Sequence, residues 1–519
     1  MYPFSEMNRA TAISSALGLA VGTLVMFVFP VHADASSCAA KNVTSGAVAD
    51  PDLQGVIDAA GSGDTIQFTG TCPGGFTIDK DLKLVGRVTS AQPNPTLSGG
   101  GASTVLTLTG DASTKVTLTD LTITDGVARN GGGIKNGPCT VALRGSTSVT
   151  GNSAAPRGEG GGIYNIRGSV TLSGSASVTN NDARFGGGVV SNYGAVRMSG
   201  SASISGNSAT SGGGGINTGM GTVTMHDHSS VSHNRAVDGG GIYQYKGSVT
   251  LNGSSSVSAN NAVDEGGGIN KYSGSVTLND ASSVSRNTVF YYDGGGIYSN
   301  SGRISLRDTS SVSRNIGRYG GGIVNGDGKV KLSGSASVSE NTAHSEGGGI
   351  YNDGGGYHDG TVTLDGSSSV VRNKARFGGG IYSFVAVKLK GSSSVSGNSA
   401  ARRGGGIYNY RGIVEAKNAS AVMRNSARRG GGVFNDGSGT EERKRTVTLD
   451  GSSSVKRNIA RRGGGIYNWS GDVRLNNSSA VTRNTARRHG GGVFNRRGVV
   501  SWRDRSVVAR NIPDNCVGC

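Results

Sequence analysis

Three carboxylates occupy the same place in three successive repeats of the chain. Asp238, Glu265 and Asp293 each stand directly before a run of three glycines. If the repeats stack at the spacing of β-strands, about 4.8 Å, these carboxylates repel one another unless protons or a cation such as Ca²⁺ separate them. Close carboxylate pairs also perform acid and base catalysis in glycosidases. The same place in other repeats holds unrelated residues: Phe185, Tyr319, Phe377 and Arg403. A solvated face is therefore the simpler interpretation, with a metal or catalytic site as the alternative.

The histidines form one further group with possible metal chemistry. His226, His228 and His233 lie close together in sequence with Asp227, and a His-x-His pair on a strand face is an acceptable start for a zinc site. Alignment with the repeat "LNGSSSV" from Leu251 places His226 to His228 in a turn, which favours an exposed polar turn. No Gly-x-Ser-x-Gly nucleophile elbow stands between a strand and a helix, so catalysis is not indicated.

Arginine pairs precede the last glycine runs of the chain. From Val371 onward the chain holds 28 Lys and Arg against 8 Asp and Glu, although its net charge as a whole is +17. Guanidinium groups bind carboxylate, sulfate and phosphate in a forked geometry, so a regular array of them suits an acidic polysaccharide or another extracellular polyanion. The alternative is an edge that is merely kept soluble and unpaired. The predicted polyanion-binding residues are Arg402, Arg403, Arg428, Arg429, Arg461, Arg462, Arg487 and Arg488.

These side chains are positioned by a short repeat. Glycine triplets occur 14 times between Gly131 and Gly490, mostly 26 or 27 residues apart. Within one repeat the apolar residues Ile163, Val170 and Leu172 alternate with small polar ones, which indicates strands and not helices. Three short strands per repeat, stacked on the next repeat, predict an all-β, right-handed parallel β-helix of about 16–17 coils.

Glycine and asparagine are expected to shape the corners of each coil. Glycine suits sharp turns and positive φ angles. The repeated asparagines Asn398, Asn425, Asn458 and Asn484 suit left-handed turn positions, and when stacked they can form a ladder of amide hydrogen bonds from coil to coil.

The two ends of the chain differ from the repeats. Residues 1–33 resemble a secretory signal peptide that is removed after Ala33, residues 34–130 are expected to form a cap and the first coils, residues 131–511 the glycine-triplet coils, and residues 512–519 a cysteine-containing tail. A capping helix is predicted with Asp50 as N-cap, Pro51 in its first turn and Gly61 as its stop. At the other end Trp502 aligns with Leu475 of the preceding coil and is expected to plug the core.

Five cysteines suit an exported, oxidising setting. Cys38 and Cys72 flank the first folded segment, and Cys516 and Cys519 close the chain, so these four are the disulfide candidates. Cys139 is left over, and the pairing cannot be derived from the sequence.

The stretches "LQGVIDAAGSGDTIQFTG", "LTLTDLTITDG" and the recurring "GGGIYN" resemble the pectin-lyase-like, right-handed β-helix superfamily. More narrowly, Gly405-Gly406-Ile407 and its equivalents are similar to the Gly-Gly-x-Ile type motif of bacterial repeat proteins grouped with the polymorphic outer membrane proteins. That resemblance implies a β-helix and a surface or extracellular location. Members with the autotransporter layout end in a membrane barrel, which is not expected here because the chain stops at Cys519, just after its last coil.

The function expected from these features is that of a secreted or cell-surface, non-enzymatic β-helix protein, a monomer without cofactor, that contacts an acidic polysaccharide or other polyanion through its basic C-terminal third. An adhesin is a further interpretation of the same fold. The enzymatic alternative is a polysaccharide lyase or glycoside hydrolase using Asp238, Glu265 and Asp293, with Ca²⁺ as its possible cofactor.

Overall fold

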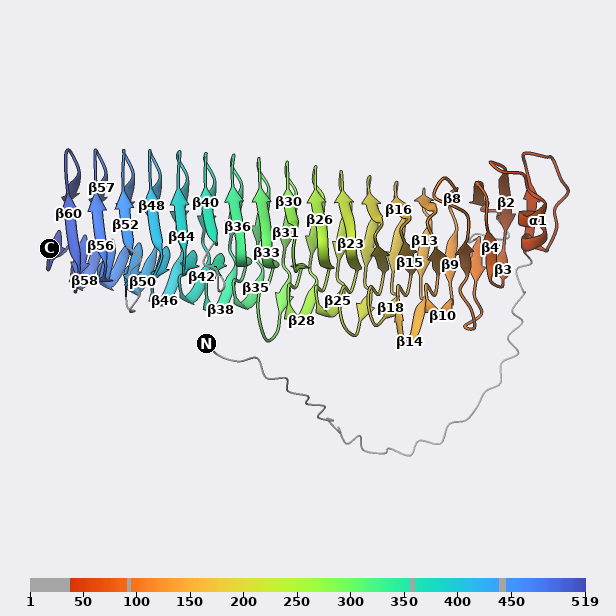
Figure 1. Ribbon diagram of the computed structural model, residues 1–519, viewed down its shortest axis with the longest axis horizontal. Helices are drawn as coiled ribbons and strands as arrows, with labels where there is room; N and C mark the ends of the chain where they lie inside the picture. The colour runs from red at the N-terminus through yellow and green to blue at the C-terminus, as the bar shows by residue number, and fades with distance from the viewer. Residues whose placement is uncertain (1–37, 91–94, 355–359, 438–444) are drawn as a thin grey trace, which may run out of the picture. The chain divides into compact units, whose positions relative to one another are not determined.

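The computed structural model describes residues 38–519 except 91–94, 355–359 and 438–444 (Figure 1). The expected signal peptide, residues 1–33, lies outside the described residues. The described chain forms a parallel β-solenoid of about 16 turns, as the sequence predicts. Among the described residues no helix has the length and apolar character needed to cross a membrane.

One turn of the solenoid can be followed from residue 394 to residue 423. Strand β45 (Ser394–Ser396) is followed by β46 (Ser399–Arg403), the triplet Gly404 to Gly406, β47 (Ile407–Tyr410), β48 (Ile413–Ala416) and then β49 (Ala421–Met423), which pairs with β45 in parallel. Each turn therefore contains four strand segments, where the sequence predicted three. The missed segment is the polar one, β46, because its side chains show no alternation of apolar and polar residues.

Equivalent strands stack into four rows, and Figure 1 shows the successive turns side by side along the solenoid. Row 1 runs from β4 (Phe76–Ile78) to β62 (Cys516–Val517), row 2 from β2 (Thr65–Thr69) to β60 (Val499–Trp502), and row 3 from β3 (Thr71–Pro73) to β61 (Val507–Ala509). Rows 1 and 2 merge into one 31-stranded sheet, because four long strands pass through both. These four are β23 (Ile216–Met225), β26 (Ile242–Leu251), β33 (Ile297–Leu306) and β36 (Ile323–Leu332).

Row 4 is a separate sheet of 14 strands and carries the residues before the glycine triplets. Its members are β10 (Val127–Asn130), β14 (Ser153–Glu159), β18 (Asp182–Ala183), β22 (Ser208–Ala209), β25 (Arg235–Asp238), β28 (Asn261–Glu265), β32 (Thr288–Val289), β35 (Ile316–Tyr319), β38 (Thr342–Glu346), β42 (Lys374–Phe377), β46, β50 (Ser426–Arg429), β54 (Ile459–Arg462) and β58 (Thr485–His489).

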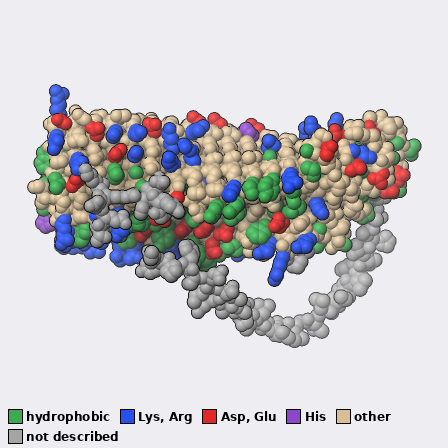
Figure 2. All heavy atoms as spheres, in the orientation of Figure 1, with side chains coloured by type: hydrophobic (Ala, Val, Ile, Leu, Met, Phe, Trp, Pro, Cys, Tyr) green, Lys and Arg blue, Asp and Glu red, His purple; other side chains and the backbone are tan. Residues whose placement is uncertain are grey.

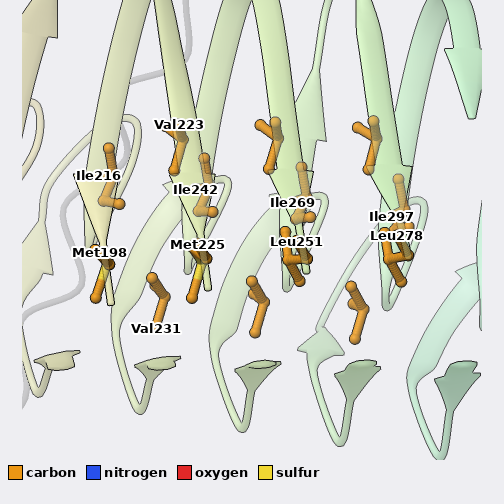
Figure 3. Close-up of a cluster of buried hydrophobic side chains, with 14 of the residues drawn as sticks. Met198, Ile216, Val223, Met225, Val231, Ile242, Leu251, Ile269, Leu278 and Ile297 are labelled. Atoms are coloured by element: carbon orange, nitrogen blue, oxygen red, sulfur yellow. The ribbon is translucent and has the colours of Figure 1, made fainter. Parts of the chain in front are cut away.

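Rows 1, 2 and 3 face inward on a narrow apolar core. In the turn after Gly213 the core residues are Ile216, Val223, Met225 and Val231, each with no exposed surface (Figure 3). The same four places are filled in the neighbouring turns, so each side chain packs on its equivalents above and below. Burial of one such side chain stabilises the fold by roughly 1.5–3 kcal/mol. Four per turn suffice for a long, thin core, which accounts for the low hydrophobic content of the chain.

The glycine triplet is required by backbone geometry. Gly404 has a φ of +66°, in the left-handed region that side chains disfavour. A Cβ atom on Gly406 would lie 2.7 Å from the backbone oxygen of Gly432 in the next turn, so no larger residue fits. The Gly404 N–H donates to the Arg429 carbonyl at 3.0 Å, and the triplets thereby bind successive turns together.

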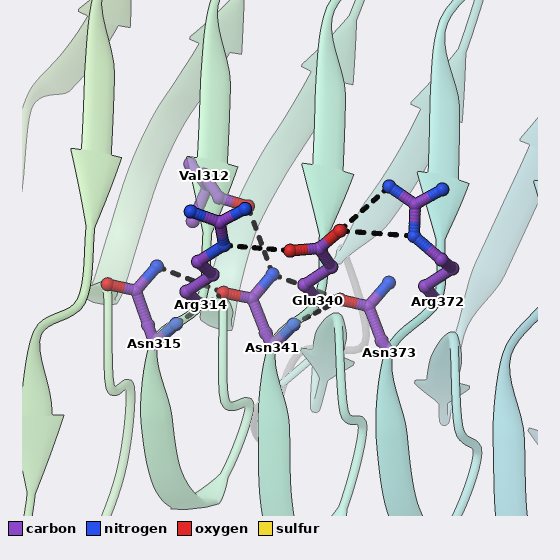
Figure 4. A network of polar contacts seen from close by, with 7 residues as sticks. All are labelled: Val312, Arg314, Asn315, Glu340, Asn341, Arg372 and Asn373. Carbon is purple, nitrogen blue, oxygen red and sulfur yellow. Dashed lines mark hydrogen bonds and ion pairs between the residues drawn. The ribbon is translucent and has the colours of Figure 1, made fainter.

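Between rows 3 and 4 the buried asparagines form the predicted ladder. Asn341 illustrates one step: its Nδ2 donates to the Val312 carbonyl at 3.0 Å and to Asn373 Oδ1 at 3.0 Å, and its backbone N–H donates to Asn373 Oδ1 at 2.9 Å (Figure 4). The same pattern joins Asn398, Asn425, Asn458 and Asn484. The ladder prediction is confirmed. The expectation that these asparagines adopt the left-handed conformation is wrong, because that conformation belongs to the residue before each of them.

The ends of the solenoid also differ in detail from expectation. Helix α1 (Leu53–Ala59) begins later than predicted, with Asp52 as its N-cap, and Asp50 Oδ1 accepts a hydrogen bond from the Asp52 N–H at 2.7 Å. Leu53 and Ile57 of α1 are buried in the core at the N-terminal end. At the other end Trp502 does align with Leu475, but it is 47% exposed, and the side chains packed on the core there are Val500, Val508 and Cys516.

Two disulfides join the predicted cysteines, Cys38 to Cys72 and Cys516 to Cys519. Cys139 is free and buried. Because β1 (Ala39–Asn42) pairs antiparallel with β2, the first bridge fastens the start of the described chain to the first turn.

Candidate functional site

The residues before the glycine triplets form one continuous column along row 4. Strand register aligns Asp238 with Glu265 and Arg403 with Arg429, and bridges continue the column between these two regions. From the N-terminal side the column reads Glu159, Phe185, Gly212, Asp238, Glu265, Asp293, Tyr319, Glu346, Phe377, Arg403, Arg429, Arg462 and His489. Its charge therefore changes from negative in the middle of the solenoid to positive near the C-terminus.

The negative part contains the three carboxylates singled out in the sequence. Burial, and then the charge of a neighbouring acidic residue, raises the pKa of Asp238 to about 6 and the pKa of Glu265 to about 7. Burial is also the main cause that raises the pKa of Asp293 to about 6, while Arg318 opposes the rise. Asn270 Nδ2 donates to Glu265 Oε2 at 3.4 Å. Burial is thus the first cause that raises the pKa values of all three carboxyl groups toward neutrality.

In the described part of the chain no three His, Cys, Asp or Glu side chains are grouped to hold a metal ion. His226 and His228 lie in the turn after β23, as the repeat alignment predicts, and His233 lies in the next turn with a φ of +57°. At Glu265 the charges of Asp238 and Asp293 in the adjacent turns add to the effect of burial in raising its pKa.

The positive part of the column rests on a ladder of aromatic rings. Tyr382, Tyr408, Phe434, Tyr467 and Phe494 follow successive triplets, with ring centroids 4.7–5.1 Å apart and planes nearly parallel. Arg403 lies over Phe434 at 5.2 Å, and Arg429 lies over Tyr467 at 6.0 Å. Arg462 covers Phe494 in the same way. Arg403, Arg429 and Arg462 are here named the inner column. Cation–π attraction and coverage of the rings explain why arginine occupies these positions.

Arg403 has further partners that fix it in place. Its Nη1 donates to the Tyr408 hydroxyl at 3.4 Å and lies 3.6 Å from Asp436 Oδ2. The Tyr408 hydroxyl donates to the same carboxylate oxygen at 2.6 Å. Because Asp436 is almost fully buried, this arginine neutralises an internal acid. The guanidinium group of Arg403 is thus occupied by protein partners, whereas Arg429 and Arg462 also line a small hollow with Arg428 and Arg461.

The first arginine of each pair has a different environment. Arg402, Arg428 and Arg461, with Arg488 in the last turn, are here named the outer column. Part of it borders a hollow of about 650 Å³ lined by Arg428, Arg461, Arg487 and Arg488, with a floor of Ala400, Ala401, Ser426, Ala427, Ile459 and Ala460. A second hollow of about 500 Å³, lined in part by Arg376 and Arg402, shares Ala401 and Arg428 with the first. Together they form a groove with a basic wall and an apolar floor.

Like charges crowd this wall. The pKa of Arg461 is lowered, first by Arg488, then by burial, and then by Arg428 and its other arginine neighbours. Figure 2 shows Lys and Arg side chains gathered along the lower edge of the C-terminal turns. An anion placed between positive groups that lower one another's pKa relieves their repulsion, so its binding is favourable.

The pair Arg487-Arg488 departs from the predicted pattern. Register places His489, and not an arginine, opposite Arg462 in the inner position. Both Arg487 and Arg488 are therefore exposed beside the groove. The extra residue arises because the segment between Asn484 and Gly490 is one residue longer than that between Asn458 and Gly463.

A second set of arginines was missed in the sequence. Arg424, Arg457, Arg483 and Arg510, here named the turn column, each precede a ladder asparagine and have φ between +54° and +57°. All four are exposed, and none has an acidic partner among the described residues. The recurring dipeptide Arg-Asn is the sequence signal that marks them.

Comparison with known proteins gives one family. Residues 335–353 and 392–410 match the Chlamydia polymorphic membrane protein repeat. Each match runs from row 3 through a ladder asparagine, a row 4 strand and a glycine triplet into row 1. The predicted similarity to this repeat group is confirmed, and it indicates a surface-exposed β-helix protein. No curated protein and no solved structure matches the chain.

Proposed function

We propose that this chain is a non-enzymatic extracellular or cell-surface protein that binds an acidic polysaccharide or similar polyanion along the groove of row 4 in its C-terminal turns. The observation that carries the proposal is the outer column: four arginines in successive turns border a groove, and the pKa of Arg461 is lowered chiefly by its arginine neighbour Arg488. Repeat proteins commonly use such extended surfaces for binding. Adhesion to another surface would follow from the same contact.

The test compares two variants on a heparin column eluted with rising salt. Changing Arg402, Arg428, Arg461 and Arg488 to Ser removes the outer column. Changing Arg303, Arg307, Lys329 and Lys331 to Ser removes an equal charge from exposed positions in and beside row 2. We expect the first variant to elute at clearly lower salt than the wild type and the second to change little, because phosphate- or sulfate-rich polymers respond to local charge. Equal elution of both variants would contradict the proposal.

A second candidate function rests on the acidic column. Carboxylates whose pKa values lie at about 6 and about 7 are suited to acid and base catalysis near neutral pH. The alternative is therefore a lyase or hydrolase of acidic polysaccharide that uses Asp238, Glu265 and Asp293. Incubation of the purified protein with polyuronates, with and without Ca²⁺, distinguishes the two functions: new reducing ends or unsaturated products, lost in Glu265→Gln, would favour the enzyme.

A further inference from the structure

We infer that the turn column and the outer column are the two walls of one binding groove, and that this groove takes a flat polysaccharide ribbon with acidic groups along both edges. The inference rests on the proposed function and specifies its ligand. It assigns a binding role to Arg424, Arg457, Arg483 and Arg510, which lie on the opposite side of row 4 from the residues before the triplets.

The turn position does not itself require arginine. In other turns of the solenoid the same position holds Gly151, Gly206 and Gly397, with φ of +65°, +67° and +64°, and also side-chain-bearing residues such as Asn180, His233 and Ala259, with φ of +54°, +57° and +55°. Glycine adopts this conformation at no cost, whereas a side chain is strained there. Arginine nevertheless occupies it in four consecutive C-terminal turns. Because several residue types occupy this position in other turns, the conformation does not select arginine, and the unbroken run of four arginines indicates a role for their side chains.

An ion-pair cluster in earlier turns shows what arginines at the turn position can bind. Glu340 occupies the turn position between Arg314 and Arg372, and its carboxylate accepts hydrogen bonds from Arg314 Nε at 2.8 Å and from Arg372 Nη2 at 2.7 Å (Figure 4). These two bonds lower the pKa of Glu340. Arginines stacked at this position therefore reach along the column and hold a carboxylate between them.

In the C-terminal turns the corresponding acid is missing. Arg424, Arg457, Arg483 and Arg510 follow one another without an acidic residue at the turn position. Their spacing is that of adjacent strands, about 4.8 Å. Anionic groups supplied by a ligand can thus take the place that Glu340 fills between Arg314 and Arg372.

The two columns are close enough to serve one ligand. Arg457 and Arg461 are four residues apart, so their Cα atoms are separated by at most about 14 Å. Between them lies the floor of small and apolar side chains, on which Ile459 is 53% exposed. The arginines that line the two hollows belong to the outer-column side, and the turn column lies beyond the floor, at the other end of the row 4 strands. A ligand that crosses the floor would therefore meet positive charge at both edges.

An extended acidic polysaccharide fits these features. In a chain with two-fold screw symmetry each sugar is turned over relative to the one before, so that its acidic groups point to alternate edges while the flat faces of the rings expose C–H groups. The edges match the two arginine columns, and the C–H faces match the alanine and isoleucine floor. A single strand of nucleic acid carries one row of phosphates and bases that need stacking rings, which the floor does not provide.

The experiment measures the affinity of the full chain for two probes of equal charge, an oligomer of polymannuronate and an oligo-dT strand. The test variant replaces Arg424, Arg457, Arg483 and Arg510 by Gly, the residue that other turns use at this position, so the fold is preserved; thermal unfolding checks this. The outer variant (Arg402, Arg428, Arg461 and Arg488 to Ser) and the row 2 control variant are measured beside it.

We expect the turn-column variant to lose affinity for polymannuronate by about 30-fold, as four exposed ion pairs of ordinary strength imply, and to change oligo-dT binding by less than about 3-fold. The outer variant should weaken binding of both probes. If the outer variant loses polymannuronate while the turn-column variant binds it like the wild type, the second wall is disproved and the proposed function stands. Equal losses for the two probes would disprove the ribbon. A wild type that binds neither probe would overturn the proposed function itself.

Discussion

The acidic and the basic turns of the solenoid use the same column of row 4 in opposite ways. Where the column holds Asp238, Glu265 and Asp293, the carboxylates are half-buried beside one another and their pKa values rise toward neutrality. Where it holds Arg403, Arg429 and Arg462, the guanidinium groups lie over the stacked rings. Burial neutralises a carboxylate but not an arginine, so one scaffold produces a protonation-sensitive surface in one region and a permanently cationic surface in the other.

The difference between the two regions also depends on the neighbouring column in row 1. Beside the basic residues the rings of Tyr382, Tyr408, Phe434 and Tyr467 follow without interruption. Beside the acidic residues tyrosines alternate with smaller residues, Asn270 and Val324. The surface chemistry of each region is therefore set jointly by the column in row 4 and the neighbouring column in row 1. The inward-facing residues of the two regions remain alike.

The largest expected effect, a loss of stability, tests whether the interior of the solenoid is the same in the acidic and the basic turns. Replacing Asn458 by Ala in the basic turns removes the hydrogen bonds that its side chain donates to the Val422 carbonyl and Asn484 Oδ1 and accepts from Asn425, and Asn287→Ala removes the equivalent bonds in the acidic turns. Each should lower the free energy of unfolding by about 4 kcal/mol, measured by urea denaturation. Clearly unequal losses would show that the scaffold, and not only its surface, differs between the regions.

A smaller effect, a gain in stability at high pH, is expected when Glu265 is replaced. Its folded pKa of about 7 exceeds the ordinary value of 4.5, so the folded state binds the extra proton, and stability is lost as pH rises through this interval. Glu265→Gln removes that loss and should stabilise the protein at about pH 8 by roughly 1 kcal/mol, allowing for partial exposure, with no gain at about pH 4.

The control for this prediction is Glu340→Gln, measured at the same two pH values. The pKa of Glu340 is lowered by Arg314 and Arg372, so its stabilising contribution is present above the ordinary pKa and lost below it. This substitution should therefore destabilise the protein at the higher pH. The same sign of change for both variants would contradict the assignment of the two environments.

The smallest effect separates the inner from the outer arginines. Arg429→Ala uncovers Tyr467 and should lower the free energy of unfolding by about 1 kcal/mol without changing the salt at which the protein leaves a heparin column. Arg428→Ala should instead lower the salt concentration at which the protein leaves the column and leave the free energy of unfolding nearly unchanged. A loss of heparin binding in Arg429→Ala equal to that in Arg428→Ala would show that the inner column also contacts the polyanion.

The fold could be predicted because the core repeats in sequence. Ile163, Val170, Leu172 and Val178 recur at fixed places, and the ladder asparagines occur once in each turn, so period and alternation were sufficient. Row 4 was missed because strands such as Ser399–Arg403 are held by backbone pairing and carry no apolar alternation. In the site, the Arg-Arg pairs were recognisable as charge, but their division into a stacked member and a free member depends on ring positions across turns. The left-handed conformation of Arg457 has no signature in its own side chain.

The ladder of buried amides has a consequence for the length of the molecule. Each turn passes the same hydrogen bonds to the next, so a segment cut between two ladder positions, such as residues 399–425, can be removed and Asn398 still meets an equivalent partner in Asn458. Unequal recombination between near-identical repeats in the gene would therefore yield shorter or longer proteins that fold. The length of the solenoid, and the number of its cationic turns, become traits that selection can adjust one repeat at a time.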